Sequence, residues 1–180
     1  MLRDLQSEHV GQLVVVPGII TSASKSQIKA SRLKMTCKNC GFEKVLTIHS
    51  GLGGVSMPRQ CERGANPGMD RERCPLDPFE ITPDGCSYVD HQVLKIQEAP
   101  DLVPTGEMPR SFVLTSDRYL VDKVSPGMRV TVVGVFSIVT RREVNASQKG
   151  QSNQAVRSSY LRVVGMQTAE GAAASGSALP

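Results

Sequence analysis

The sequence predicts a mainly β protein in which a small closed barrel is interrupted by one long cysteine-rich insertion. Hydrophobic residues make up 39% of the 180-residue chain and aromatic residues only 4%, so the core must be built of Val, Ile and Leu, which favour strands. Short apolar stretches alternate with turns, and all five cysteines fall between residues 37 and 86. About five main strands with one long insertion predict an OB-type Greek-key barrel. An SH3-like barrel is the alternative, because strand count alone does not separate the two.

The first part of the barrel is expected in residues 1–36. Residues 13–20 are apolar on both sides and predict a buried strand with a bulge or bend at Pro17-Gly18. A second strand is predicted at 28–36, where basic and apolar residues alternate and give the strand one basic face.

Residues 37–87 are expected to form a zinc-ribbon-like insertion. Cys37-Lys38-Asn39-Cys40 places two thiols where both can face one tetrahedral ion, and Gly41 then allows a tight turn. A strand is plausible at 44–49, and five prolines exclude a long helix. No apolar run reaches the roughly 18 residues of a membrane span, and no signal peptide is apparent, so we expect a reducing compartment in which clustered cysteines bind metal.

The cysteine spacing is C-x2-C-x20-C-x12-C, with Cys86 after a further eleven residues, so five thiols are offered for the four ligands of a structural zinc site. A redox C-x-x-C motif would open a helix in a βαβ unit, whereas the flanks here are strand-like. A zinc deaminase needs an H-x-E motif, and no histidine of this chain is followed by Glu two residues later. A structural zinc site is therefore favoured.

The rest of the barrel is expected in residues 88–168. Strands are predicted at 88–98, 112–114, 128–139 and 160–164, with a proline-rich loop at 99–109 and a projecting β-hairpin at about 139–160. Residues 169–180 are rich in Ala, Gly and Ser and predict a flexible tail.

The formal net charge of +4 is concentrated in one segment. Between Arg141 and Arg162 there are five basic residues and one acidic residue, which account for the whole excess. Residues 37–86 carry six basic and seven acidic residues, a formal −1. The predicted hairpin is therefore the candidate anion-binding surface, and the insertion is not.

Several blocks of the sequence resemble the minichromosome maintenance (MCM) replicative helicases. They are Arg3-Asp4-Leu5 with residues 13–20, residues 94–98 and residues 126–134. Three further stretches, 74–79, 103–110 and 117–120, resemble one subunit type of the eukaryotic ring. Because these unrelated blocks occur in the family's order over roughly residues 3–168, the chain is identified as similar to the N-terminal collar of such a subunit.

The resemblance implies a set of site residues. The family's pattern selects Cys37, Cys40, Cys61 and Cys74 as ligands of a structural Zn²⁺ and leaves Cys86 out. The matching hairpin touches DNA phosphates in the ring channel, which implies DNA contacts for Arg141, Arg142, Lys149 and Arg157. Bases on the barrel are weaker candidates, because ordinary solvation explains each of them equally well: Lys25, Lys29 and Lys95.

The resemblance also implies partners. These are single- and double-stranded DNA, paralogous subunits in a hetero-hexamer and a head-to-head double hexamer, and replication initiation factors, in the nucleus and without a membrane. No G-x-x-x-x-G-K-[ST] loop is present, so we expect no catalysis from this chain alone, with ATP and Mg²⁺ confined to an ATPase domain that this sequence lacks. The alternative function is a zinc-stapled protein-interaction module without direct DNA contact.

Overall fold

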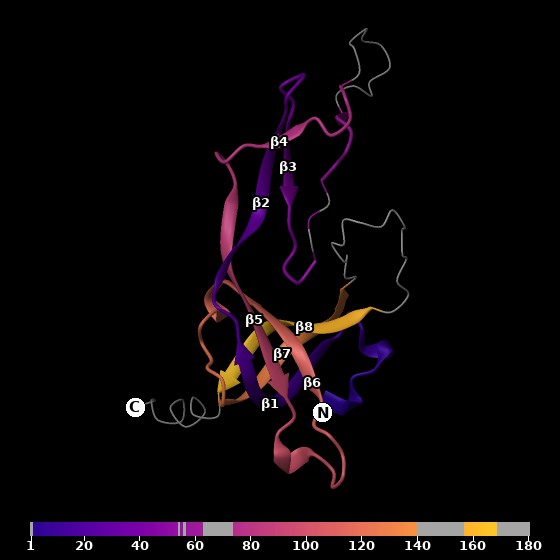
Figure 1. Ribbon diagram of the computed structural model, residues 1–180, viewed down its shortest axis with the longest axis vertical. Coiled ribbons are helices and arrows are strands. Elements are labelled where there is room, and N and C mark those ends of the chain that lie inside the picture. Colours follow the sequence, from indigo (N-terminus) through magenta and orange to yellow (C-terminus); the bar gives the residue numbers. More distant parts are fainter. Residues whose placement is uncertain (1, 54, 56, 63–73, 140–156, 169–180) are drawn as a thin grey trace, which may run out of the picture. The chain divides into compact units, whose positions relative to one another are not determined.

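The computed structural model describes residues 2–53, 55, 57–62, 74–139 and 157–168, which form eight strands and four short 3-10 helices (Figure 1). The strands are β1 (Leu13–Ala23), β2 (Gln27–Cys37), β3 (Glu43–Thr47), β4 (Phe79–Ile81), β5 (Ser87–Gln97), β6 (Ser111–Asp117), β7 (Arg129–Val139) and β8 (Ser158–Thr168). The helices are η1 (Leu2–Asp4), η2 (Ser7–His9), η4 (Pro100–Leu102) and η5 (Arg118–Leu120). The expected mainly β class is confirmed, and the described residues include no helix with the length and apolarity that crossing a membrane requires.

The chain divides into two compact units. The first comprises Met1–Gln27 and Asp90–Pro180, and the second comprises Ile28–Val89. The predicted insertion, 37–87, lies inside the second unit, which also takes in residues 28–36. The reason is that β2, expected as a barrel strand, pairs with β3 from Arg32 to Thr36 and with β4 from Met35 to Cys37.

In the first unit, the strand pairings form a closed ring. β1 pairs antiparallel with β7, β7 antiparallel with β8, β8 parallel with β6, β6 antiparallel with β5, and β5 antiparallel with β1 again. Five strands joined in this way leave no open edge in the ring, as a five-stranded barrel requires.

The core of the first unit consists of the residues that alternate inward along these strands. In β7, for example, Val130, Val132 and Phe136 are buried, and the Phe136 ring meets Phe112 edge-on at a centroid distance of 6.0 Å. Leu2 of η1 also belongs to this buried cluster, so the N-terminal segment contributes to the core. The remaining members of the buried cluster are mostly Val, Ile and Leu, as the composition predicts: Val16, Ile20, Leu94, Ile96, Leu114, Leu120, Val124, Leu161 and Val163.

A bulge or bend is expected at Pro17-Gly18, but both residues lie within β1 and the strand register does not shift there. The β1–β7 register runs unbroken across both residues, and the irregularity lies further on, between Ile20 and Ser22 opposite β5. Gly18 instead serves a close approach, because a Cβ at this position would lie 2.6 Å from the carbonyl oxygen of Gln97. Pro17 is tolerated because β1 begins to pair with β5 only at Ile19, so one side of the proline has no strand partner.

The second unit has a much smaller apolar interior. Pro78 is buried in its described part, and the other buried hydrophobic side chains there are Leu33, Met35, Cys37 and Cys61. Two of these five are cysteines, so packing alone gives this unit little hydrophobic stabilisation. Most of the predicted hairpin, at 140–156, and the predicted tail at 169–180 lie outside the described residues.

Candidate functional site

The second unit brings Cys37 and Cys40 together by a tight turn at the end of β2. Cys37 is the last residue of β2 and lies opposite Phe79 of β4. The amide of Gly41 donates to the carbonyl of Cys37 at 2.9 Å, and the amide of Cys37 donates to the carbonyl of Phe42 at 2.8 Å. Gly41 has φ of +68°, the left-handed conformation that favours glycine, so the residue after the C-x-x-C motif is what lets the chain reverse there.

Two loop segments supply Cys61 and Cys74. The amide of Asp77 donates to the carbonyl of Arg59 at 2.8 Å, and the guanidinium of Arg59 pairs with the Asp77 carboxylate at 3.2 Å. These contacts tie the segment that carries Cys61 to the segment that carries Cys74. Lys44 of β3 forms an ion pair with Glu62, which holds the first of these segments beside the sheet.

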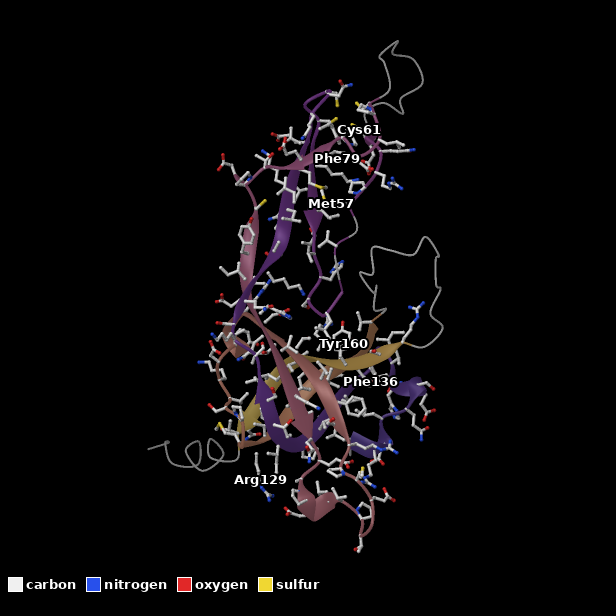
Figure 2. All side chains as sticks on the ribbon, viewed as in Figure 1. Met57, Cys61, Phe79, Arg129, Phe136 and Tyr160 are labelled. Atoms are coloured by element: carbon white, nitrogen blue, oxygen red, sulfur yellow. The ribbon has the colours of Figure 1, made fainter. Side chains whose placement is uncertain are left out.

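The four Sγ atoms of Cys37, Cys40, Cys61 and Cys74 all lie within 4.8 Å of one another. Cys37 Sγ lies 3.8 Å from Cys74 Sγ, and Cys40 Sγ lies 3.5 Å from Cys61 Sγ. A tetrahedral zinc with Zn–S bonds of about 2.3 Å requires sulfur–sulfur separations of about 3.8 Å. The thiols therefore fit a tetrahedral metal ion, and Figure 2 shows Cys61 and Phe79 at the same end of this unit.

The cluster also favours ionisation of one thiol. Burial raises the pKa of Cys37, but the backbone amides of Cys40 and Asn39, followed by the Cys40 and Cys74 thiols, outweigh it and lower the pKa to about 7. For Cys74 the Asn39 amide, 3.7 Å from the sulfur, lowers the pKa, but burial and the Cys40 and Cys37 thiols outweigh it and leave the pKa raised. Because metal ions bind thiolates, the lowered pKa favours Cys37 as a ligand near neutral pH.

Cys86 lies apart from the cluster. Its thiol donates to the carbonyl of Thr82 at 3.1 Å and accepts from the amide of Lys34 at 3.4 Å. The structure thus groups four of the five thiols and uses the fifth as a local hydrogen-bonding group.

The predicted DNA contacts are only partly described. Arg141, Arg142 and Lys149 lie outside the described residues. In the first unit, Lys25, Lys95 and Arg157 are exposed, with Lys95 on β5 and Arg157 immediately before β8. Lys29 belongs to the second unit and donates to the carbonyl of Gly51, which makes it a less available phosphate ligand.

Two polar contacts at the ends of the proline-rich loop, Glu98 with Arg3 and Arg110 and Asp101 with Arg129, were not predicted from the sequence. Glu98, 4% exposed, accepts from Arg3 Nε at 3.1 Å and from the Arg110 amide at 3.0 Å. Burial raises the Glu98 pKa, but the Arg110 amide and the Arg3 guanidinium outweigh it and lower that pKa. Arg129 of β7, labelled in Figure 2, pairs with Asp101 of the same loop at 2.7 Å. Periodicity could not reveal these pairs, because their members are far apart in the sequence.

Comparison with known proteins identifies the family. Residues 1–140 match the family model described as the MCM OB domain. The chain is 43% identical over 167 residues to the DNA replication licensing factor mcm5-B of Xenopus laevis, covering 92% of this chain and 22% of the relative. It is 41% identical over 177 residues to the DNA replication licensing factor MCM5 of Arabidopsis thaliana, covering 98% of this chain and 24% of the relative.

A third relative, the DNA replication licensing factor mcm-5 of Caenorhabditis elegans, is 42% identical over 166 residues, again covering 92% of this chain and 21% of the relative. The chain thus spans less than a quarter of the length of these relatives. All three carry the number five in their names, in agreement with the blocks at 74–79, 103–110 and 117–120 that resemble the fifth subunit of the eukaryotic ring. The OB family model also decides between the two barrel types left open by strand count.

Proposed function

The chain belongs to the MCM family, and from this we propose that it is the N-terminal collar of a replicative helicase subunit. This collar, an OB domain with a zinc site, binds DNA and forms a ring in replication initiation and fork unwinding. The observation that carries the proposal is the four-thiol cluster, whose geometry fits a structural metal ion, on a chain that matches the MCM OB domain.

Zn²⁺ is the proposed ion, held by Cys37, Cys40, Cys61 and Cys74. The donor set supports this choice, because four thiolates in tetrahedral reach are typical of structural zinc and leave no open position for catalysis. When bound, the ion cross-links the turn after β2 to the two loop segments. The role proposed for these residues here is to position four thiolates around the ion, two of them buried and two partly exposed.

The second unit is proposed to contact protein and not DNA. Its cysteine segment has a formal charge of −1, which becomes −3 when four thiols ionise and one Zn²⁺ binds. A surface of this sign repels phosphate on average, although the segment also contains arginines such as Arg59. Its proposed partners are neighbouring helicase subunits in the hexamer and the second ring of a head-to-head double hexamer.

DNA contact is assigned to the basic segment and the exposed bases of the first unit. The support is the excess positive charge between Arg141 and Arg162, together with the exposure of Arg157, Lys25 and Lys95. Backbone phosphates of single- and double-stranded DNA are the proposed ligands, so we expect little sequence preference. Lys29 completes the proposed set, with the smallest expected contribution.

A salt series tests the DNA assignment. Single-stranded binding has a log–log salt slope of about −0.7 per neutralised phosphate, so three or four engaged bases give a slope of roughly −2 to −3. Replacement of Arg141, Arg142, Lys149 and Arg157 with Ala is expected to flatten this slope in fluorescence anisotropy of a labelled oligonucleotide. Replacement of the exposed Arg32 and Lys38 in the second unit, neither of which holds a cysteine segment in the contacts described above, is the control and is expected to leave the slope unchanged.

If the slope of the quadruple variant is unchanged, the contact belongs instead to Lys25 and Lys95 on the barrel, and replacement of those two residues is the next measurement. If neither set matters, the protein is a zinc-stapled interaction module without direct DNA contact.

The remaining proposals concern the assembled protein. ATP and Mg²⁺ are proposed to bind outside this chain, in an ATPase domain of the subunit, because no phosphate-binding loop is present here. Paralogous subunits and replication initiation factors are the proposed protein partners, and the nucleus is the proposed location. Native mass spectrometry of the 180-residue chain gives zinc content and oligomeric state in one measurement.

A further inference from the structure

We propose that the four-thiol cluster is also a peroxide-sensitive redox site, in which oxidation joins Cys37 to Cys74 and Cys40 to Cys61 and releases the metal ion. The inference rests on the proposed zinc site and goes beyond it, because a site that only stabilises the fold need not form disulfides.

All four Sγ atoms lie within 4.8 Å of one another, and direct sulfur–sulfur contact is the reason for choosing these two pairs. The Cys37 and Cys74 sulfur atoms lie 3.8 Å apart, and those of Cys40 and Cys61 lie 3.5 Å apart. A disulfide bond is about 2.0 Å long, so each pair has to approach by only about 1.5–1.8 Å. The two pairs share no member, so both bonds can form in the same molecule.

Exposure explains why the cluster can react with peroxide, whichever thiols pair. Cys40 and Cys74 are partly exposed, whereas Cys37 is 1% and Cys61 9% exposed. Each pair therefore combines one thiol that peroxide can reach with one that is sheltered from it. Oxidation of an accessible thiol beside a second thiol is the arrangement that yields a disulfide in place of over-oxidation.

The chemistry is the same in both pairs and uses hydrogen peroxide as the oxidant. The Cys74 thiolate, which ligation of the ion would keep deprotonated, attacks one peroxide oxygen, the O–O bond breaks, and the departing hydroxide takes a proton to leave as water, so Cys74 becomes a sulfenic acid. The Cys37 thiolate then attacks that sulfur, the S–S bond forms, and the displaced hydroxide also leaves as water. Two thiolates, one peroxide and two protons thus give one disulfide and two waters. Cys40 and Cys61 consume a second peroxide, and the ion leaves because metal ligation requires thiolates.

The pairing has a structural consequence. The two predicted disulfides would connect the turn after β2 to the segments that carry Cys61 and Cys74, the same connections that the metal ion makes. A local Cys37–Cys40 disulfide would leave both segments untied from that turn. The proposed pairing therefore preserves the connectivity of the second unit without metal and allows recovery when a dithiol reductant and Zn²⁺ are returned.

The experiment first measures the zinc content of the untreated chain, which tests the proposed metal site by itself. The zinc-loaded protein is then titrated with hydrogen peroxide while a chromophoric chelator reports free Zn²⁺, and disulfides are mapped by mass spectrometry after alkylation of the remaining thiols. Cys86→Ser is the matched control, because Cys86 lies outside the cluster. We expect release of one zinc per chain, both disulfides in wild type and in Cys86→Ser, and rebinding of zinc after reduction.

Three results would overturn the inference while leaving a zinc site intact: zinc retention at peroxide concentrations that oxidise Cys86, a dominant Cys37–Cys40 disulfide, or over-oxidation of the cluster without any disulfide. An untreated chain without zinc would instead overturn the proposed metal site. In that case peroxide treatment and mapping of the metal-free chain still test the pairing. Because these measurements use wild-type protein, they do not depend on the folding of a cluster variant.

Discussion

The two units of this protein differ in how many apolar side chains they bury, and therefore in how each can offset the conformational entropy lost on folding. The first unit buries a contiguous apolar cluster inside a closed ring of five strands. Among the described residues of the second unit, the buried apolar side chains other than cysteines are Leu33, Met35 and Pro78. A unit with so little apolar burial cannot offset its loss of conformational entropy by packing alone. We therefore expect hydrophobic burial to stabilise the first unit and the proposed metal ion to stabilise the second.

Metal removal is the strongest way to separate the two units. Zinc binding in small modules contributes on the order of 10 kcal/mol to folding. We expect a chelator, or Cys61→Ser, to abolish amide protection in the second unit and to leave protection in β1, β7 and β8 largely intact, as measured by hydrogen exchange. Cys86→Ser is the control that keeps zinc stoichiometry at one; loss of zinc in this variant together with retention in Cys61→Ser would contradict the ligand set.

A core truncation in the first unit is expected to have the opposite pattern. Leu114 is fully buried at the centre of the ring, so Leu114→Ala should destabilise that unit by about 2–5 kcal/mol. Leu13, 62% exposed, is the matched control, and Leu13→Ala should change stability by no more than about 0.5 kcal/mol. Chemical denaturation monitors the barrel, and zinc content monitors the second unit; zinc loss in Leu114→Ala would show that the units do not fold independently.

The close approach at Gly18 is expected to give a smaller effect. A methyl group at this position would lie 2.6 Å from the Gln97 carbonyl oxygen and 2.7 Å from Ile96 Cγ1, so Gly18→Ala should cost about 1–3 kcal/mol through displacement of β5. At Gly165 nothing lies within 4 Å of the added Cβ, so Gly165→Ala is the control. Equal thermal midpoints for the two variants would show that β1 and β5 can move apart without cost.

The smallest effect concerns pH. Because the folded-state pKa of Glu98 is lowered, the stability that this carboxylate contributes is fully present above its ordinary pKa and is lost as pH falls through the lowered value. Glu98→Gln should therefore reduce stability at neutral pH and flatten the acid limb of the stability curve of the first unit. The exposed Glu8, replaced by Gln, is the control. An acid limb unchanged in Glu98→Gln would assign that pH dependence to other carboxylates.

Much of this protein could be predicted from its sequence because the relevant signals are local. Alternation of apolar residues placed most strands close to their observed positions; the strand predicted at 128–139, for example, is β7 at Arg129–Val139. The C-x-x-C-G motif also indicated its own turn, since two thiols and a positive-φ glycine within five residues need no distant contact to adopt it. The clustered thiols likewise predicted a metal site. The family resemblance then indicated which four of the five cysteines would be its ligands.

Only the tertiary structure decided which distant segments meet. The hydrophobic period of a single strand does not show which strands pair. It could not reveal that β1 and β5 close the ring, that β6 pairs in parallel with β8, or that most of β2 belongs to the second unit. Pro17-Gly18 illustrates the reason: the residues suggested a bulge, whereas the glycine is required because β5 passes within van der Waals contact. Local preferences indicate which face of a segment is apolar. The partner of that face is set by contacts between residues far apart in the chain, such as Arg3 with Glu98 and Leu13 with Val135, which are separated by about 120 positions.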